Sequence, residues 1–497
     1  MTEFAGAIDS KSYDVIVVGA GGSGLAAAVS AAESGASVLV LESQQRPGGT
    51  SRMAVGSISA AGTHLQKQAG IVDNSNDFIT DMELFTADLL VHDNANLRQV
   101  LAEQASPTVD WLSQMGVVFV GPYAEPPHRV ERMHNAVPGA ASIVERLLIA
   151  CQSLGVEIQT QSSVSQLHQF ADGRVHALSF KSLDGMHRVS ARKAVILASG
   201  DFSASKTMCS AHLPLEASRA IPINPTNTGE MFDVACKVGA QTLNMQHVFG
   251  PQMRFPAGTS THIANKMPSW PWLNQFMAMF FEYAPPALKK LLAKPMLMAH
   301  MSPSEQLFAQ GAVLVDENGQ LLDNKSPAKS IAMTESRRGF IVMPNHVAKK
   351  FNALPYFIST APSIAYAFID DYISGRPDIT FKAKDLETLS TSMGLSNAKG
   401  LRQSLSGISA DYWVGLGPVQ AMLTTTEGSI AINSQCQVMG ATGQPIESLY
   451  AVGCIGQGGL LLRGHGLHLA WAFTSGRIAG KYAASKKLLK ETSHATV

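Results

Sequence analysis

Paired cysteines are missing from this sequence. The chain has five cysteines, and no two of them form a Cys-x-x-Cys pair. That spacing argues against zinc sites, iron–sulfur clusters and disulfide scaffolds, so we expect no metal site. It fits a reducing compartment. The cysteines are Cys151, Cys209, Cys236, Cys436 and Cys454.

An excess of charge is also missing, because 38 basic residues balance 38 acidic ones. Nucleic-acid-binding proteins usually carry a basic excess, so no nucleic-acid partner is expected. No apolar run reaches the roughly 20 residues of a membrane-spanning helix. The N-terminus shows no basic region followed by an apolar run, and hence no signal peptide. These absences predict a cytoplasmic protein.

The chain does have length, and its start has a recognisable order of elements. Its 497 residues are enough for two or three lobes at roughly 150 residues per domain. Residues 13–18 form an apolar run typical of a strand buried on both faces. Glycines, a helix-compatible segment at 25–33 and a second apolar run at 37–41 follow. Farther on, residues 95–165 look helical before a strand at 156–158, and 384–407 have helical spacing.

The first turn carries the pattern Gly19-x-Gly21-x-x-Gly24, and Glu42 ends the next strand about 20 residues later. In such a turn the first glycine permits the tight bend and the second lets a pyrophosphate approach the backbone. The third allows the helix to pack on the strand. The helix N-terminus offers unpaired N–H groups to the phosphates, and Glu42 would accept hydrogen bonds from a ribose. The segment therefore predicts a dinucleotide site.

Further segments favour FAD over a nicotinamide cofactor: Arg-Pro-Gly-Gly-Thr-Ser at 46–51, Leu-Tyr-Ala-Val-Gly at 449–453 and Ser-Gly-Arg-Ile-Ala-Gly at 475–480. With 194–200 and 227–230, they make the chain resemble the flavoprotein subunits of fumarate reductase and succinate dehydrogenase. That superfamily also contains soluble fumarate reductases and 3-ketosteroid dehydrogenases. The resemblance covers nearly the whole chain, and we expect it to be closer to the ketosteroid-dehydrogenase-like desaturases than to true fumarate reductases.

The resemblance implies an α/β fold with a discontinuous Rossmann-type FAD-binding domain and an inserted α+β capping domain. The expected FAD-binding segments are 1–245 and 426–497, and the cap is 246–425. The helix after Gly466 should point its N-terminus at the flavin. The residues expected to contact FAD are Gly19, Gly21, Gly22, Ser23, Gly24, Glu42, Ser43, Gly48, Gly49, Thr50, Ser51, Val164, Ser199, Gly200, Gly453, Cys454, Gly466 and Leu467.

Several positions depart from the family pattern. Cys454 stands where the family has an acidic flavin contact, and residues 50–60 contain no histidine for covalent attachment, so we expect non-covalent FAD. Arg463 aligns with the substrate-binding arginine, allowing one residue of gap. The two substrate histidines fall at Thr425 and near Pro251, and the acid arginine falls at Lys329. Fumarate itself is therefore not the expected substrate.

The expected catalytic residues are Arg463, Lys329, His465, Tyr412 and Tyr123. Arg463 would clamp a carboxylate or polarise a carbonyl, with a structural anchor as the alternative. Lys329 would transfer a proton or be a solvated loop lysine. For His465 a packing role stands beside the catalytic one, and either tyrosine could supply a phenol to a ketone. The cluster at 126–134, rich in histidine and arginine, lines the substrate side or is a surface charge cluster.

The expected reaction is desaturation of a CH–CH bond next to a carbonyl, in a cyclic or apolar ketone, by hydride transfer to flavin N5. One alternative is reduction of an unsaturated carboxylic acid. Another is a membrane-surface or partner-binding flavoprotein that uses the apolar segment 265–300. The expected partners are a small-molecule substrate and an unidentified electron donor or acceptor.

Overall fold

The computed structural model describes residues 8–256, 270–283, 302–361 and 365–488. Its main sheet joins segments from both ends of the chain. The strands run in the order β22 (Gln437–Met439), β23 (Pro445–Ala451), β9 (Gly185–Leu197), β1 (Ile8–Val18), β2 (Val38–Leu41) and β6 (Glu157–Gln159). β7 (Ser163–Gln169) and β8 (Val175–Ser182) extend the sheet from β9.

Parallel pairing in the centre of this sheet brings distant segments together. β9 pairs in parallel with β1 and with β23, where Leu449 lies opposite Val195. The side chains of residues 15–17 and 194–197 are fully buried. Near-continuous apolar runs are what a strand covered on both faces requires. The discontinuous α/β sheet expected from the sequence is therefore confirmed.

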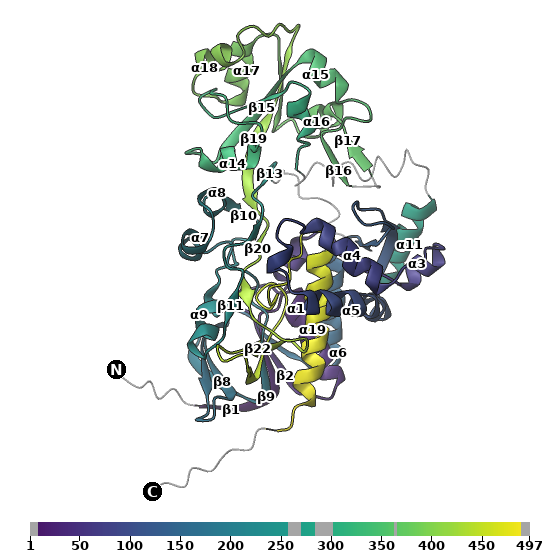
Figure 1. The fold of residues 1–497 in the computed structure, drawn as a ribbon, viewed down its shortest axis with the longest axis vertical. Coiled ribbons are helices and arrows are strands. Elements are labelled where there is room, and N and C mark those ends of the chain that lie inside the picture. The colour runs from purple at the N-terminus through teal and green to yellow at the C-terminus, as the bar shows by residue number, and fades with distance from the viewer. Residues whose placement is uncertain (1–7, 257–269, 284–301, 362–364, 489–497) are drawn as a thin grey trace.

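Helices cover the sheet, and the first packs against the last (Figure 1). α1 (Gly22–Glu33) lies beside α19 (Leu467–Ser485). A Cβ built on Gly476 would lie 2.3 Å from the Ser23 carbonyl oxygen, and one on Gly480 would lie 2.3 Å from that of Ala27. Glycine is thus required because the two helices meet backbone to backbone. α5 (Ala95–Gln114) and α6 (Ala140–Ser153) pack against α19 and α1 respectively.

A second sheet forms the cap in the upper part of Figure 1. Its central strand β19 (Trp413–Leu423) pairs with β10 (Ile221–Pro222), β13 (Gln252–Arg254), β15 (Arg338–Pro344) and β18 (Thr380–Ala383), and β14 (Val313–Val315) pairs with β15. A capping sheet was expected and is confirmed. β10 comes from before residue 246, so the cap sheet includes a strand of the first expected segment; the domain boundaries themselves stay predictions.

Most of the other elements are short. They are α2 (Gly49–Met53), β3 (Ser57–Ser59), α3 (His64–Gln68), α4 (Ser75–Phe85), η1 (Leu90–His92), α7 (Lys206–His212), α8 (Leu215–Ser218), α9 (Glu230–Lys237), β11 (Thr242–Leu243), β12 (Val248–Phe249), α11 (Pro271–Tyr283), α13 (Gln306–Ala309), α14 (Pro327–Met333), α15 (Asn345–Lys350), β16 (Ser359–Ala361), β17 (Ala365–Ala367), α16 (Ile369–Gly375), β20 (Thr425–Thr426) and β21 (Ser429–Ile430). Within the described ranges, no helix is both long and apolar enough to span a bilayer.

Of the two segments with helical spacing, the first differs from the expectation. Within 95–165, the helix ends at Gln114, and β4 (Val118–Tyr123) and β5 (Met133–Val137) follow. These strands form because β5 finds two partners, β3 on one side and β4 on the other. Within 384–407, the helical spacing corresponds to two helices, α17 (Leu386–Met393) and α18 (Ala398–Ser404). Gly394, at φ +71°, ends the first in the left-handed region that glycine favours.

Candidate active site

The glycine-rich turn between β1 and α1 is as tight as its sequence suggests. Gly19 has φ +106°, and a Cβ there would lie 2.5 Å from the Ala198 carbonyl oxygen. A Cβ on Gly24 would lie 1.9 Å from the carbonyl oxygen of Gly19. Both glycines are therefore needed by the fold itself. They bring the start of α1 against the end of β9.

Gly21 differs from Gly19 and Gly24 because a side chain there would enter open space. It is the N-cap of α1 with φ −72°, and a Cβ there would meet no atom within 4 Å. Any L-residue can adopt this backbone conformation, so the open space beside a helix N-terminus is what distinguishes the position. Across the turn, the buried hydroxyl of Ser199 has no hydrogen-bond partner. Open space and an unsatisfied polar atom fit a bound pyrophosphate.

Glu42 is held at the end of β2 by backbone N–H groups. Its carboxylate accepts hydrogen bonds from the N–H of Ala20 at 2.7 Å and from that of Gln44 at 2.8 Å. The Glu42 carbonyl accepts from the N–H of Ser162 at 2.8 Å, which places Val164 two residues farther along β7. Ser43 is exposed beside them. The two expected adenosine contacts, Glu42 and Val164, are thus neighbours in space.

A polar network links the segment after Gly48–Gly49 to the other side of the site. The side-chain amide of Asn224 donates to the Thr50 hydroxyl at 2.8 Å. That of Asn227 donates to Asp201 at 2.8 Å, and the N–H of Thr426 donates to Asp201 at 3.0 Å. Asp201 is 1% exposed and follows the expected contacts Ser199 and Gly200.

Ser51 packs on Gly22, because a Cβ built on Gly22 would lie 2.5 Å from the Ser51 hydroxyl.

The turn after β23 approaches the same loop. The N–H of Gly453 donates to the Ser475 hydroxyl at 3.0 Å, and a Cβ on Gly453 would lie 2.5 Å from the hydroxyl of Ser23. Burial raises the pKa of the Cys454 thiol to about 12, with a further contribution from Asp201. Cys454 is therefore a neutral thiol at the position where the sequence comparison above expects an acidic residue.

The turn before α19 places His465 beside a buried carboxylate. Gly466, at φ +78°, is the N-cap, and Leu467 is the first, buried residue of the helix. The Ser59 hydroxyl donates to the His465 carbonyl at 2.7 Å. Nδ1 of His465 lies 2.7 Å from Oε1 of Glu125, which also accepts the His465 N–H at 2.7 Å. This hydrogen bond raises the pKa of His465.

Arg463 lies two residues before His465 and bonds to a buried carboxylate of its own. One guanidinium nitrogen lies 3.3 Å from Oε2 of Glu427 and 3.4 Å from the Val248 carbonyl oxygen. Nε of Arg463 is buried without a partner. Glu427 is fully buried, and burial raises the pKa of its carboxyl although Arg463 opposes the shift. The guanidinium is thus paired with a carboxylate, while its Nε–H has no hydrogen-bond partner among the described residues.

Lys329 and Arg463 line one pocket of about 180 Å³, together with Val248, Pro251 and Glu216. Lys329 is 59% exposed, and its ammonium lies 3.3 Å from Glu216. The structure therefore brings together the arginine, the lysine and the proline that the sequence aligned with the family's substrate residues. Lys329 itself is in a solvated surface ion pair.

The two tyrosines lie in different places. Tyr412 precedes β19, at the end far from Thr425, and the Lys382 ammonium lies 4.1 Å from the centre of its ring. Eleven strand residues separate Tyr412 from the strand's other end, a distance of roughly 35 Å. The structure thus does not bring Tyr412 to the other candidates. Tyr123 ends β4 opposite Met133, which in turn lies opposite Ser59.

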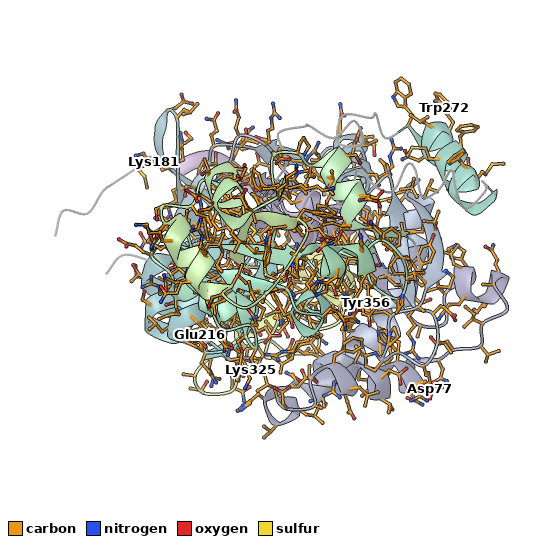
Figure 2. The ribbon with its side chains drawn as sticks, turned by 90° about the horizontal axis from the view of Figure 1, so that it is seen from above. Asp77, Lys181, Glu216, Trp272, Lys325 and Tyr356 are labelled. Atoms are coloured by element: carbon orange, nitrogen blue, oxygen red, sulfur yellow. The ribbon has the colours of Figure 1, made fainter. Side chains whose placement is uncertain are left out.

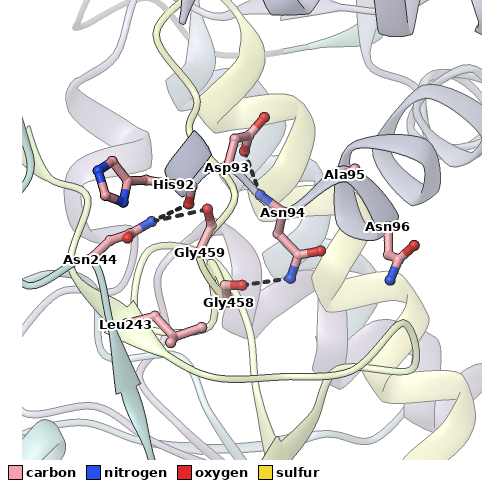
Figure 3. Close-up of a pocket in the computed structure, with 9 residues that line it drawn as sticks. All are labelled: His92, Asp93, Asn94, Ala95, Asn96, Leu243, Asn244, Gly458 and Gly459. Atoms are coloured by element: carbon pink, nitrogen blue, oxygen red, sulfur yellow. Dashed lines mark hydrogen bonds between the residues drawn. The ribbon is translucent and has the colours of Figure 1, made fainter. Parts of the chain in front are cut away.

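A polar pocket of about 310 Å³ lies at the N-terminus of α5 (Figure 3). The Asn94 side chain caps this helix and donates to the Gly458 carbonyl at 2.8 Å, while Asn244 donates to that of Gly459 at 3.1 Å. None of the candidate catalytic residues lines this pocket. Its hydrogen bonds instead hold the paired glycines of the C-terminal block against α5.

The sequence did not indicate three buried carboxylates of the site. Each one bonds to a residue that the sequence did indicate: Glu125 to His465, Asp201 to Asn227 and Glu427 to Arg463. Glu125, Asp201 and Glu427 are 6%, 1% and 0% exposed. Glu125 lies in the same segment as the cluster at 126–134, which was the one signal for it. Asp201 directly follows the Ser199–Gly200 turn, and Glu427 lies between Thr425 and the strand β21.

Comparison with known proteins places the chain among flavoproteins. The family model described as FAD binding domain matches residues 14–461. Vinyl phenol reductase of Lactiplantibacillus plantarum is 27% identical over 95% of this chain and 96% of that protein. The open conformation of a flavocytochrome c3 fumarate reductase superimposes with a TM-score of 0.73, 22% identity, and coverage of 96% and 78% of the two chains. For 3-ketosteroid Δ1-dehydrogenase from Sterolibacterium denitrificans the TM-score is 0.67, with 16% identity over 96% and 100%.

Proposed function

Because the chain belongs to the FAD-binding-domain family and is an FAD-dependent oxidoreductase of CH–CH bonds, we propose that it reduces a C=C bond conjugated to one electron-withdrawing group. The observation that carries the proposal is Arg463, whose side chain lines a pocket and is 21% exposed, so a bound molecule can reach its guanidinium. When bound, FAD supplies the hydride. Negative charge then develops on the group conjugated to the alkene, and a preorganised guanidinium donor stabilises it there.

The charge around Arg463 favours a substrate with a single such group. Glu427 neutralises Arg463, and Glu216 neutralises Lys329 in the same pocket. A dicarboxylate would bring two negative charges to a site whose cations already have carboxylate partners. Removing the two substrate carboxylates from water costs free energy, and the paired cations would offset little of that cost. An unsaturated monocarboxylic acid or a vinyl phenol meets the requirement better than fumarate does.

Vinyl phenol reductase, the relative whose length matches this chain, supports reduction as the direction of the reaction. It bears the name of a reductase, and the match extends over nearly all of both chains. We therefore place reduction ahead of the desaturation expected from the sequence. The superposition also gives a higher TM-score for the fumarate reductase than for the ketosteroid dehydrogenase, so the expected closeness to the latter finds no support in it.

The test is the oxidation of reduced enzyme by an alkene. Holoenzyme is reduced with dithionite without air and mixed with an aryl acrylic acid, a vinyl phenol, a cyclic enone or fumarate. We expect rapid return of oxidised-flavin absorbance with the acid or the phenol, and a slow return with fumarate. If fumarate is the fastest oxidant, the single-group argument is wrong. If no alkene reoxidises the flavin, reduction is wrong.

Desaturation is examined in the same cuvette. Oxidised holoenzyme is mixed with a saturated cyclic ketone, which should bleach the flavin only if the enzyme removes hydrogen from the CH–CH bond. Bleaching faster than the reoxidation by every alkene would reverse our order of the two reactions.

Exposed aromatic side chains on α11 favour one further candidate, attachment to a membrane surface. Trp272 and Phe276 are each 64% exposed, and Figure 2 shows Trp272 at the rim of the molecule. The rest of the apolar segment 265–300 lies largely outside the described residues. In this proposal the two side chains enter the headgroup region. Co-sedimentation with vesicles that is lost in Trp272→Ser/Phe276→Ser would support it, whereas protein that stays in the supernatant would end it.

A further inference from the structure

The reduction proposed above needs a proton for the second alkene carbon, and the turn before α19 carries a group suited to donate it. We propose that His465, paired with Glu125, is the proton donor, with Glu125 as its positioning residue. This inference rests on the proposed function. It assigns to one residue pair a step that the sequence left between Lys329 and several other candidates.

The geometry of the pair is that of an oriented imidazole. One carboxylate oxygen of Glu125 accepts both from the His465 backbone N–H and from Nδ1, each at 2.7 Å. The ring is therefore fixed from one side, and Nε2 is left to face away from the carboxylate. Glu125 is 6% exposed, whereas the His465 side chain is 71% exposed. The carboxylate is thus buried behind a ring that remains accessible.

The His465 ring lies between α19 and the cap strand β13. Arg254 of β13 lies near enough to act on the charge of His465. One turn farther along α19, the His468 ring lies 6.2 Å from that of Phe249 of β12. Arg463 is two residues away in the chain. The charged or titratable groups that face His465 are therefore Glu125 from the 124–132 loop, Arg254 from β13 and His468 from α19.

The loop that carries Glu125 is anchored beneath the surface. The carbonyl of Glu125 accepts the His128 N–H at 3.0 Å, and His128 bonds through Nδ1 to Arg132 at 3.1 Å. Arg132 is fully buried and forms ion pairs with Asp73 and Asp81. Within the cluster at 126–134, His128 and Arg132 thus form a buried anchor, whereas the Arg129 side chain is 44% exposed. A buried second layer of this kind holds a functional side chain in one orientation.

The electron and proton balance of the step is complete. A hydride from reduced FAD adds two electrons to one alkene carbon, and the π bond breaks. The electron pair left on the other carbon forms a C–H bond with the proton of His465 Nε2, whose N–H bond breaks. The alkene is reduced, the flavin is oxidised, and neutral His465 regains a proton from solvent. In the test, dithionite supplies the electrons that reduce the flavin.

Lys329 is the competing donor, and its setting is less suitable. Its ammonium is on the surface, 59% exposed and paired with Glu216. A general acid works best when its pKa lies near the working pH. The hydrogen bond to Glu125 raises the pKa of His465 from the ordinary value of a histidine, so the ring carries its proton through a wider pH range.

The catalytic test is single-turnover oxidation of reduced holoenzyme by the best alkene of the panel. His465→Gln should slow this step by about a hundredfold or more, which is the usual contribution of a general acid. Reoxidation by ferricyanide should be unchanged, because no carbon is protonated. The matched control is His64→Gln, since His64 and Asp110 form a similar pair at 2.6 Å on α3 and α5. That variant should react at the wild-type rate.

The positioning role of Glu125 is tested by the pH profile. The protonated imidazole is the donor, so the alkene rate should fall as pH rises through the folded pKa of His465. Without the carboxylate charge, that pKa is lower. Glu125→Gln should therefore move the falling limb to lower pH, and Glu125→Asp should restore part of the shift. A purely structural loss would lower the rate at every pH and leave the limb in place.

A second measurement does not depend on turnover. Imidazole NMR titration, with the His465 signal identified by its loss in His465→Gln, should give a raised pKa that falls in Glu125→Gln. An unshifted His465 would overturn the pairing. Full alkene activity in His465→Gln would overturn the donor role while leaving the proposed function intact. Wild-type enzyme inert toward every alkene would instead overturn the proposed function, and the donor role with it.

Discussion

At the scale of the residue, two glycines of one motif serve different purposes. A methyl group on Gly24 has no room in the protein itself, whereas one on Gly21 meets only open space. Gly21→Ala should therefore fold as well as wild type but bind FAD roughly ten- to a hundredfold more weakly, since the methyl would overpack the ligand. The measurements are the melting temperature of the apoprotein and the FAD titration of both proteins.

Gly24→Ala serves as the comparison, because its Cβ would lie 1.9 Å from the Gly19 carbonyl oxygen. We expect a lower melting temperature even without FAD, by an amount equivalent to at least about 1–3 kcal/mol. If both variants lose FAD with the same loss of apoprotein stability, the distinction between the two glycines is wrong.

Arg463 allows a prediction that separates catalysis from stability. Arg463→Ala should lose at least about a hundredfold in alkene reduction while retaining FAD, because the substrate loses its orienting group. It also leaves Glu427 buried without a cation, which costs roughly 3–5 kcal/mol if the carboxylate stays charged. The raised pKa of Glu427 means that protonation relieves part of this cost as pH falls.

The double variant Arg463→Met/Glu427→Gln removes both charges. We expect it to recover most of the lost stability and none of the activity, as measured by denaturant unfolding and by stopped-flow reoxidation. Recovery of activity with stability would mean that Arg463 is only an anchor.

Two residues of the cofactor loop, Gly19 and Gly24, could be predicted because backbone atoms leave no room for a side chain there. Only glycine fits at these positions, and the short glycine pattern shows it in the sequence. The buried carboxylates Glu125, Asp201 and Glu427 could not be predicted this way. They act through partners that lie far away in sequence, and a lone Asp or Glu has no spacing that indicates its partner.

At the scale of the element, the glycines of the C-terminal helix have a structural use. In α19 they allow close contact with α1, and no helix of ordinary side chains could replace this contact. Gly476→Ala should destabilise the protein by roughly 1–3 kcal/mol, because the methyl meets the backbone of Ser23. Chemical denaturation measures it.

Ser485→Ala at the exposed end of the same helix is the control. It should change the free energy of unfolding by less than about 0.5 kcal/mol. Alanine is a better helix former than glycine or serine, so helix propensity alone would stabilise both variants. A Gly476→Ala variant as stable as Ser485→Ala would therefore contradict the packing argument.

Strands made of a continuous apolar run could be predicted from the sequence, whereas strands that mix polar and apolar residues could not. The apolar runs at 15–18 and 194–197 are strands because both sheet faces are covered. Residues 118–137 contain a strand pair that helical spacing concealed, since β5 is held by partners 74 or more residues away as well as by a neighbour. Such pairing is settled by tertiary contacts, which local propensity does not report.

At the scale of the whole molecule, the binding mode of the cofactor can be tested directly. Because residues 50–60 contain no histidine, FAD should leave the protein when it unfolds. Acid precipitation should give a yellow supernatant and a colourless pellet, with FAD identified by chromatography. A flavin retained in the washed pellet would contradict this prediction. Added FAD should also raise the melting temperature in a concentration-dependent manner, as expected for a ligand of the folded state alone.

The parallel pairing of β23 with β9 has a consequence for synthesis on the ribosome. Leu449 pairs with Val195, so about 250 residues are translated between the two strands. At roughly 5–20 residues per second, this interval lasts roughly 13–50 s. During that time the apolar residues 194–197 of β9 in a nascent chain lack the strand that pairs with them, and an unpaired strand edge is a template for aggregation. The protein should therefore depend on chaperones during translation more than a chain with contiguous domains does.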